Sequence, residues 1–172
     1  MPTALQLAAG DPALQARVRD CRRLLTHRAL MGAAASAVPV PGLDWAVDAA
    51  LLTQLLPEIN TRFGLTPHQL ARLPAQKRHE VQKAASVVGS LVIGRLVTRE
   101  LVLRLARTVG MRMSAKQAAR YVPIAGQAVA ALMGFAALRY LGEEHIKDCV
   151  RVVLETHLAL PAPTPQVLEL SG

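Results

Sequence analysis

Two carboxylates lie one helical turn apart, at Asp44 and Asp48, and flank Trp45 and Val47. A pair of carboxylates can act as general acid and general base, but such pairs normally face each other across a cleft from separate elements. Here both would lie on one mostly buried helix, where like charges one turn apart repel mildly. We therefore expect structural roles: the helix N-terminus stabilises Asp44, and Asp48 pairs with an arginine of another helix.

A thiol and an imidazole also lie one turn apart, at Cys149 and His145, and could form a nucleophile and its base. Cys149 belongs to the apolar stripe of its segment, so an inert core thiol is the stronger interpretation. The sequence contains no zinc-binding motif, phosphate-binding loop or nucleophile elbow. It predicts no catalytic site, no metal and no cofactor. We expect that the protein is not an enzyme, and keep an unrecognised soluble enzyme as an alternative.

Basic side chains offer the remaining chemistry, in a chain whose formal net charge is +8. Four arginines fall on one side of a predicted helix: Arg95, Arg99, Arg104 and Arg107. Such a face binds lipid headgroups or an acidic protein surface, although an ordinary solvated face is the alternative. Nucleic acid is disfavoured, because aromatic residues for base stacking make up only 3% of the chain. The four arginines are therefore predicted to bind a membrane or a protein partner, and homo-oligomerisation stays open.

The elements that position these groups are predicted to be helices. Apolar residues make up 52% of the 172 residues, and they are mainly alanine, leucine and valine, of which the first two strongly favour helix. No alternating pattern or hairpin turn indicates a strand. Caps, prolines and glycines predict a compact all-α bundle of about five to seven helices. The expected helices cover 12–37, 43–62, a short piece from 67, 77–109, 114–120, 124–141 and 143–158.

Two similar breaks interrupt these helices. The first contains Pro39, Pro41 and Gly42, and the second contains Pro123 and Gly126. Proline ends a helix and glycine permits close approach or a positive φ, so both breaks are predicted to be tight elbows. Two explanations stay open: two similar helix breaks, or an internal duplication of a helical hairpin.

A single domain is expected for a chain of this length. It covers residues 11–158, after a flexible N-terminus over 1–10 and before a disordered, proline-rich tail over 159–172. The two cysteines, Cys21 and Cys149, are too few for a disulfide framework, so we expect free, buried thiols. The first residues do not resemble a signal peptide, and we expect a cytoplasmic protein.

One uncharged stretch, over 121–138, approaches the length of a membrane span. Its alanine, glycine and proline content makes it only moderately hydrophobic, and a helix buried at the centre of a bundle explains the same pattern. The alternative is an integral membrane protein in which 121–141 and 29–52 form a hairpin in the bilayer.

Two longer sequence runs give a resemblance to a known family. The run VPVPGLDWAVD at 38–48, continuing to RFGL at 62–65, resembles the helical, non-GTPase domain of the immunity-related GTPases. It is similar also to bacterial membrane-associated proteins of unknown function that have a related helical domain. The run ARYVPIAG at 119–126, with the apolar segment and helix that follow it, resembles the second hallmark of that domain. The resemblance covers residues 28–153.

The resemblance implies an all-α domain that, in the family, accompanies a GTPase module and works at membranes or in assemblies. The residues before 38 are too few for such a module, so GTP hydrolysis is not expected, and no catalytic residue of the family maps here. We expect a non-catalytic, bacterial helical adaptor at the cytosolic face of a membrane or on a partner protein. A separately encoded GTPase is the partner that the resemblance suggests.

Overall fold

The computed structural model describes residues 2–35, 43–90, 92–95, 98 and 125–162. Within these ranges the fold is all-α, as predicted, and contains no strand. The helices are α1 (Ala4–Leu7), α2 (Pro12–Ala35), α3 (Leu43–Phe63), α4 (Pro67–Ala71), α5 (Ala75–Val88) and α7 (Ala125–Thr156).

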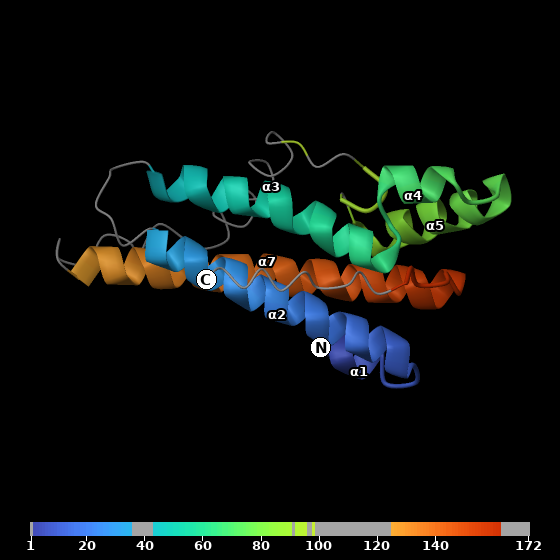
Figure 1. Ribbon diagram of the computed structural model, residues 1–172, viewed down its shortest axis with the longest axis horizontal. Helices are drawn as coiled ribbons and strands as arrows, with labels where there is room; N and C mark the ends of the chain where they lie inside the picture. Colours follow the sequence, from blue (N-terminus) through green and yellow to red (C-terminus); the bar gives the residue numbers. More distant parts are fainter. Residues whose placement is uncertain (1, 36–42, 91, 96–97, 99–124, 163–172) are drawn as a thin grey trace, which may run out of the picture.

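Helix α7 is the element against which the others pack. It contacts α1, α2, α3 and α5, and Figure 1 shows it extending along the molecule beneath α3, with α2 crossing it and α5 at one end. The main core is aliphatic, as the composition indicates, and joins α2, α3 and α7. Burying one leucine- or valine-sized side chain contributes about 1.5–3 kcal/mol, so this shared core holds the helices together. Its largest fully buried side chains include Leu14, Leu25, Leu55, Ile59, Phe63, Ile146 and Val150.

Several predicted helix ends are confirmed, because each depends on local chemistry. Asp11 caps α2: its Oδ1 accepts hydrogen bonds from the backbone N–H groups of Ala13 (2.9 Å) and Leu14 (3.0 Å). Thr66 caps α4 in a reciprocal capping box with Gln69. Gly64 follows α3 with a φ of 76°, the left-handed conformation that favours glycine.

The expected flexible segment over 1–10 instead contains a helix. Thr3 and Gln6 form a capping box at the start of α1, and Ala4 and Ala8 are fully buried. The Thr-x-x-Gln spacing was the available signal for this helix start. The helix forms because its small residues pack against α7, a contact that a local pattern does not reveal.

The first residues of the predicted disordered tail, which was expected over 159–172, instead pack against the fold. Leu158 is buried and Leu160 packs against the main core. The Arg17 guanidinium donates from Nη2 to the carbonyl of Pro161 at 2.6 Å. Residues up to 161 therefore belong to the packed body, while 163–172 lie outside the described residues.

The predicted helix over 77–109 is too long. Helix α5 ends at Val88, where Gly89 adopts a φ of 77° and Ser90 donates from its backbone N–H to the Ala85 carbonyl at 3.0 Å. This is the glycine-terminated helix end that satisfies the last carbonyl groups. The prediction extended through Gly89 because apolar residues continue beyond it. Residues 99–109 and the predicted helix at 114–120 lie outside the described part.

The predicted break at Gly142 is wrong, because α7 continues through it without interruption. A Cβ atom at Gly142 would lie 2.8 Å from Leu25 Cδ2 and 3.1 Å from Leu25 Cγ. Glycine costs about 1 kcal/mol relative to alanine inside a helix. That cost is offset here because the missing side chain lets α2 approach α7 and bury Leu25 completely.

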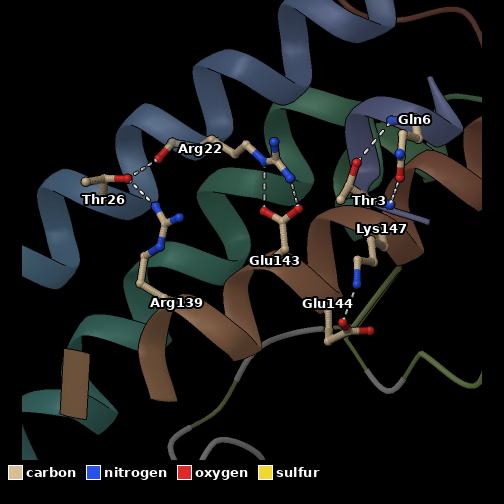
Figure 2. A network of polar contacts seen from close by, with 8 residues as sticks. All are labelled: Thr3, Gln6, Arg22, Thr26, Arg139, Glu143, Glu144 and Lys147. Atoms are coloured by element: carbon tan, nitrogen blue, oxygen red, sulfur yellow. Dashed lines mark hydrogen bonds and ion pairs between the residues drawn. The ribbon is translucent and has the colours of Figure 1, made fainter. Parts of the chain in front are cut away.

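Polar contacts flank this close approach, as Figure 2 shows. The Arg22 guanidinium of α2 makes a bidentate ion pair with the Glu143 carboxylate of α7, with Nε and Oε2 2.9 Å apart. Arg139 of α7 donates to the Thr26 hydroxyl, which donates to the Arg22 carbonyl at 2.8 Å. Partly buried, bidentate pairs are stronger than ordinary surface pairs. The ion pair and these hydrogen bonds fix the register of α2 on α7. The hydrogen bond to Thr26 explains why the apolar stretch contains Arg139.

Four of the five predicted elbow residues lie outside the described part of the chain: Pro39, Pro41, Gly42 and Pro123. Gly126 is described and lies in the first turn of α7, so it belongs to the helix and not to a break before it. The hypothesis of an internal duplication stays a prediction. The described helices include none whose length and hydrophobicity would suffice to cross a membrane.

We predict that Gly142→Ala lowers the free energy of unfolding by about 1–3 kcal/mol, because the added Cβ overpacks against Leu25. Without that contact, alanine would stabilise the helix by up to about 1 kcal/mol. Urea denaturation followed by circular dichroism measures the difference. The matched double variant with Leu25→Ala should lose less stability than the two single losses added together. Additive losses would show that the two positions do not touch.

Candidate functional site

A chain of buried polar groups crosses the core from α3 to α7. Asn60, only 1% exposed, donates from Nδ2 to the Val92 carbonyl at 3.2 Å. Its Oδ1 lies 2.9 Å from Nε2 of His145. Because the amide nitrogen faces a carbonyl, Oδ1 must be the acceptor and the histidine must donate from Nε2. One interaction therefore sets the amide orientation and the histidine tautomer.

The predicted pair of Cys149 and His145 comes together beside this amide. Cys149 Sγ lies 3.7 Å from His145 Nε2 and 3.7 Å from Asn60 Oδ1. Burial raises the pKa of Cys149 well above its usual value and lowers the pKa of His145 to about 4. A nucleophilic cysteine reacts as its thiolate, and the near histidine nitrogen already bears a proton. The geometry supports a core role for Cys149 and no activation of its thiol.

The second thiol has a similar environment. Cys21 is fully buried in α2, and burial raises its pKa to about 12. Both cysteines are free and buried, as the sequence predicts. Across the described residues, no group of three or more histidine, cysteine, aspartate or glutamate side chains could hold a metal ion.

The structure places only part of the predicted site. Arg95 is exposed, but it lies in a turn over 92–95 and not on a helix, which corrects the predicted helical face. Its backbone N–H donates to the Val92 carbonyl at 3.3 Å. Arg99, Arg104 and Arg107 lie outside the described residues. Asp44 and Asp48 lie near the start of α3, but their side chains fall outside the described part as well.

The segment that contains α4, α5 and Arg95 is rich in basic residues, which the sequence analysis missed. Residues 66–95 contain five lysine or arginine residues and one glutamate, a net charge of +4 out of the +8 of the chain. Lys77 is half-buried and is engaged by Glu80 (2.9 Å) and by the Thr156 carbonyl (2.7 Å). Four exposed cations remain and define what we term the basic face: Arg72, Arg78, Lys83 and Arg95. Their density between 72 and 83 was the signal in the sequence.

A pocket of about 210 Å³ opens at the basic face, between α4, α5 and the turn over 92–95. Polar atoms make up the larger part of its exposed lining, which includes Gln82, Ser86, Ser90 and Arg95 together with Gly94. Four almost fully buried apolar residues also belong to the lining: Leu70, Val81, Ala85 and Ile93. In Figure 1, α4 and α5 lie together at one end of the molecule, away from α2.

Two hydrogen bonds fix the turn that forms one wall of the pocket. The Gly94 N–H donates to the Leu65 carbonyl at 3.0 Å, and the Val92 carbonyl accepts from Asn60. Gly94 has a φ of 70°, and an added Cβ would meet Leu70 Cδ1 at 3.0 Å. The buried polar chain thus positions Ile93 and Arg95 relative to α5.

Comparison with known proteins gives an informative similarity. No family model matches the chain, and no solved structure matches it. "Interferon-inducible GTPase 5" of Rattus norvegicus is 33% identical over 125 residues, which is 72% of this chain and 27% of that protein. This chain is similar to part of a GTPase. It spans about a quarter of the length of that relative, so the similarity supports a GTPase-related helical region and nothing finer. Bacterial origin and membrane association stay predictions.

We predict that the fold loses stability as the pH falls from about 6.5 to about 4. The pKa of His145 falls from 6.5 to about 4 on burial, so in this window the unfolded chain binds a proton that the folded chain does not. The loss attributable to His145 is about 2–3 kcal/mol between pH 7 and pH 4.5. Asp148 partly offsets it, because burial raises its pKa to about 6 and the folded chain takes up that proton first.

Urea denaturation of the wild type and of His145→Gln at both pH values isolates the histidine contribution. Glutamine can still donate to Asn60 but does not titrate. The wild type should lose more stability than the variant on acidification. Parallel pH profiles for the two proteins would contradict the assignment to His145.

Proposed function

We propose that this chain is a non-catalytic helical adaptor that associates with an acidic surface: the cytosolic face of a membrane or a partner protein. A separately encoded GTPase is the partner that we propose first. The observation that supports the proposal is the basic face, which has four exposed cations between residues 72 and 95, one of which, Arg95, lines a pocket. Clustered lysine and arginine side chains attract anionic surfaces through summed Coulomb interactions.

The buried chemistry supports the non-catalytic part of the proposal. The pair of Cys149 and His145 is buried, with the thiol protonated and the imidazole neutral at pH 7. A thiol in such surroundings is inert, because it neither forms a thiolate nor meets substrate. The polar chain through Asn60 instead fixes the turn that bears Arg95.

The similarity to a region of a named GTPase supports the choice of partner. In that relative, the similar region forms 27% of a longer protein. A helical region of this kind can act on a GTPase within one chain or between chains, and we propose the second arrangement here. This step rests on relatedness and needs its own test.

We predict that the native protein sediments with anionic phosphatidylserine vesicles if the acidic surface is a membrane. Arg78→Gln with Arg95→Gln should weaken this binding about 30-fold, because each cation near such a surface contributes about 1 kcal/mol. The matched control changes Arg19 and Arg23 of α2 to glutamine, two exposed cations away from the basic face. Equal losses for both pairs would indicate attraction by net charge alone.

A second variant tests the arginines that the sequence singled out. Changing Arg95, Arg99, Arg104 and Arg107 to glutamine together should release the protein from the same vesicles. If neither variant changes binding, the electrostatic form of membrane association is wrong.

Photocross-linking tests the proposal that the acidic surface belongs to a partner protein. A photoreactive residue at the exposed position Ser86 should cross-link a GTPase in cells, and the product is identified by mass spectrometry. The matched control places the same residue at the exposed position Ala16 of α2. Cross-linking to a GTPase from both positions, or from neither, would argue against docking at the basic face.

A further inference from the structure

The buried apolar side chains of the described residues form two separate clusters. One is the main core, and the other, which we term the second cluster, joins α2, α3, α7 and the turn over 92–95. On α2 and α7 the second cluster lies beyond the main core: Leu25 precedes Ala29, and Ile146 follows Leu138. The bundle therefore has two apolar centres along its length. The members of the second cluster are Ala29, Leu52, Leu56, Val92 and Leu138.

Each of the three long helices contains a bend-prone residue between the two clusters. On α2, the Thr26 hydroxyl donates to the Arg22 carbonyl at 2.8 Å, a bond to the preceding turn that often bends helices. On α3, Pro57 lies inside the helix and has no N–H for the helical hydrogen-bond ladder. On α7, Gly142 lies inside the helix and leaves the backbone there with the greatest conformational freedom.

Tertiary contacts place these three positions at one level of the bundle. Leu25 of α2 occupies the space beside Gly142 of α7, where a side chain would otherwise lie. Arg28, three residues farther along α2, pairs with Glu58 of α3, which directly follows Pro57. Because the bend-prone positions lie side by side, the three helices can bend there in concert.

The ion pair that crosses this level between α2 and α3 is weak. Arg28 Nη2 and Glu58 Oε2 are 3.5 Å apart, and the two side chains are 33% and 36% exposed. Exposed pairs of this kind contribute little, because water and salt screen the charges. The stronger pair of Arg22 and Glu143 lies on the main-core side on both helices, so it does not oppose a bend.

We propose that the bundle opens at a hinge formed by Thr26, Pro57 and Gly142, so that its far part bends away as one unit and exposes the second cluster. The far part comprises residues 27–35, 43–56 and 125–141. Figure 1 shows these segments together at the end of the molecule opposite α4 and α5. Hinge motion of this kind needs only a few residues that absorb the backbone change, while the main core stays packed.

The opening is coupled to the basic face through Val92. The side chain of Val92 belongs to the second cluster, whereas its carbonyl accepts from Asn60 and from the backbone N–H of Arg95. Loss of the second cluster therefore removes part of the packing that positions Arg95. A ligand that binds Arg95 better in the closed form opposes the opening, and linkage makes this effect reciprocal. The inference goes beyond the proposed function and holds whether or not the basic face binds a GTPase or a membrane.

Hydrogen exchange of the full chain, followed amide by amide with NMR, tests the opening. We expect the amides of the three far segments to share one opening equilibrium and to exchange at least about tenfold faster than the main-core amides over 146–153. One rate for far and main-core amides alike, or three unrelated rates in the far segments, would overturn the inference.

Two arginine variants distinguish the hinge from global unfolding. Arg28→Gln removes the pair that crosses the hinge and should speed exchange in all three far segments about two- to fivefold. Arg62→Gln is the matched control, because Arg62 pairs with the same Glu58 carboxylate at 3.1 Å from the main-core side. This control should leave exchange of the far part unchanged. Equal effects of the two variants would show that the far part exchanges through global unfolding.

Pro57→Ala tests the hinge itself. Alanine supplies the missing N–H and favours a straight helix, so exchange should slow at least about tenfold, also in residues 27–35 and 125–141 of the other two helices. Slowing confined to α3 would overturn the concerted opening. The amide of Gly94, which donates to the Leu65 carbonyl, reports on the turn. It should exchange faster in Arg28→Gln and more slowly in Pro57→Ala, and an unchanged rate would reject the coupling to the basic face.

Discussion

The close approach of α2 and α7 at Gly142 is the contact on which the rest of the packing depends. It allows Leu25 to be fully buried, and the ion pair between Arg22 and Glu143 fixes the two helices in one register. Helix α7 also contacts α1, α3 and α5, so the helix that is paired with α2 in this register is shared by the packing of the other three. A helix with a side chain at that position would stand farther from its neighbour, and interhelical packing responds to changes of one methylene group.

The buried amide of Asn60 connects the core to a turn at the surface. It holds His145 in one tautomer on one side and the turn over 92–95 on the other. Two residues of this turn, Ile93 and Arg95, line the pocket. A buried polar group is stable only when its hydrogen bonds are made, so the amide penalises any displacement of the turn. The hydrogen bonds of Asn60 in the core thereby position residues that lie at the surface.

Sequence alone predicts the features that depend on a few neighbouring residues. The starts of α2 and α4 follow from Asp11 and Thr66, whose side chains bond to N–H groups within three residues. The proximity of Cys149 to His145 follows from helical periodicity. The roles of the glycines could not be predicted from neighbouring residues. Gly89 ends a helix, whereas Gly142 lies inside one because Leu25 of another helix occupies the space that a side chain would fill. Asn60, the partner of His145, belongs to a different helix and leaves no mark on the local pattern.

The same limit applies to the site. The sequence indicated a basic surface and named Arg95, but it placed that residue on a helix and overlooked Arg72, Arg78 and Lys83. A helical wheel finds faces only within a continuous helix, whereas this surface joins α4, α5 and a turn. The pocket could not be predicted from the sequence either, because Leu70, Val81 and Ile93 come together only through tertiary packing.

The packing of α2 on α7 also has a consequence for how the chain folds as it is synthesised. The ion pair between Arg22 and Glu143 and the hydrogen bond from Arg17 to Pro161 join the two ends of the described fold. Contacts so distant in sequence make folding slower than is usual for a helical protein. Until α7 has left the ribosome, α1, α2, α3 and α5 lack the one helix that all four contact. The nascent chain therefore exposes apolar helix faces until α7 has been synthesised, the condition under which chaperones engage a growing polypeptide.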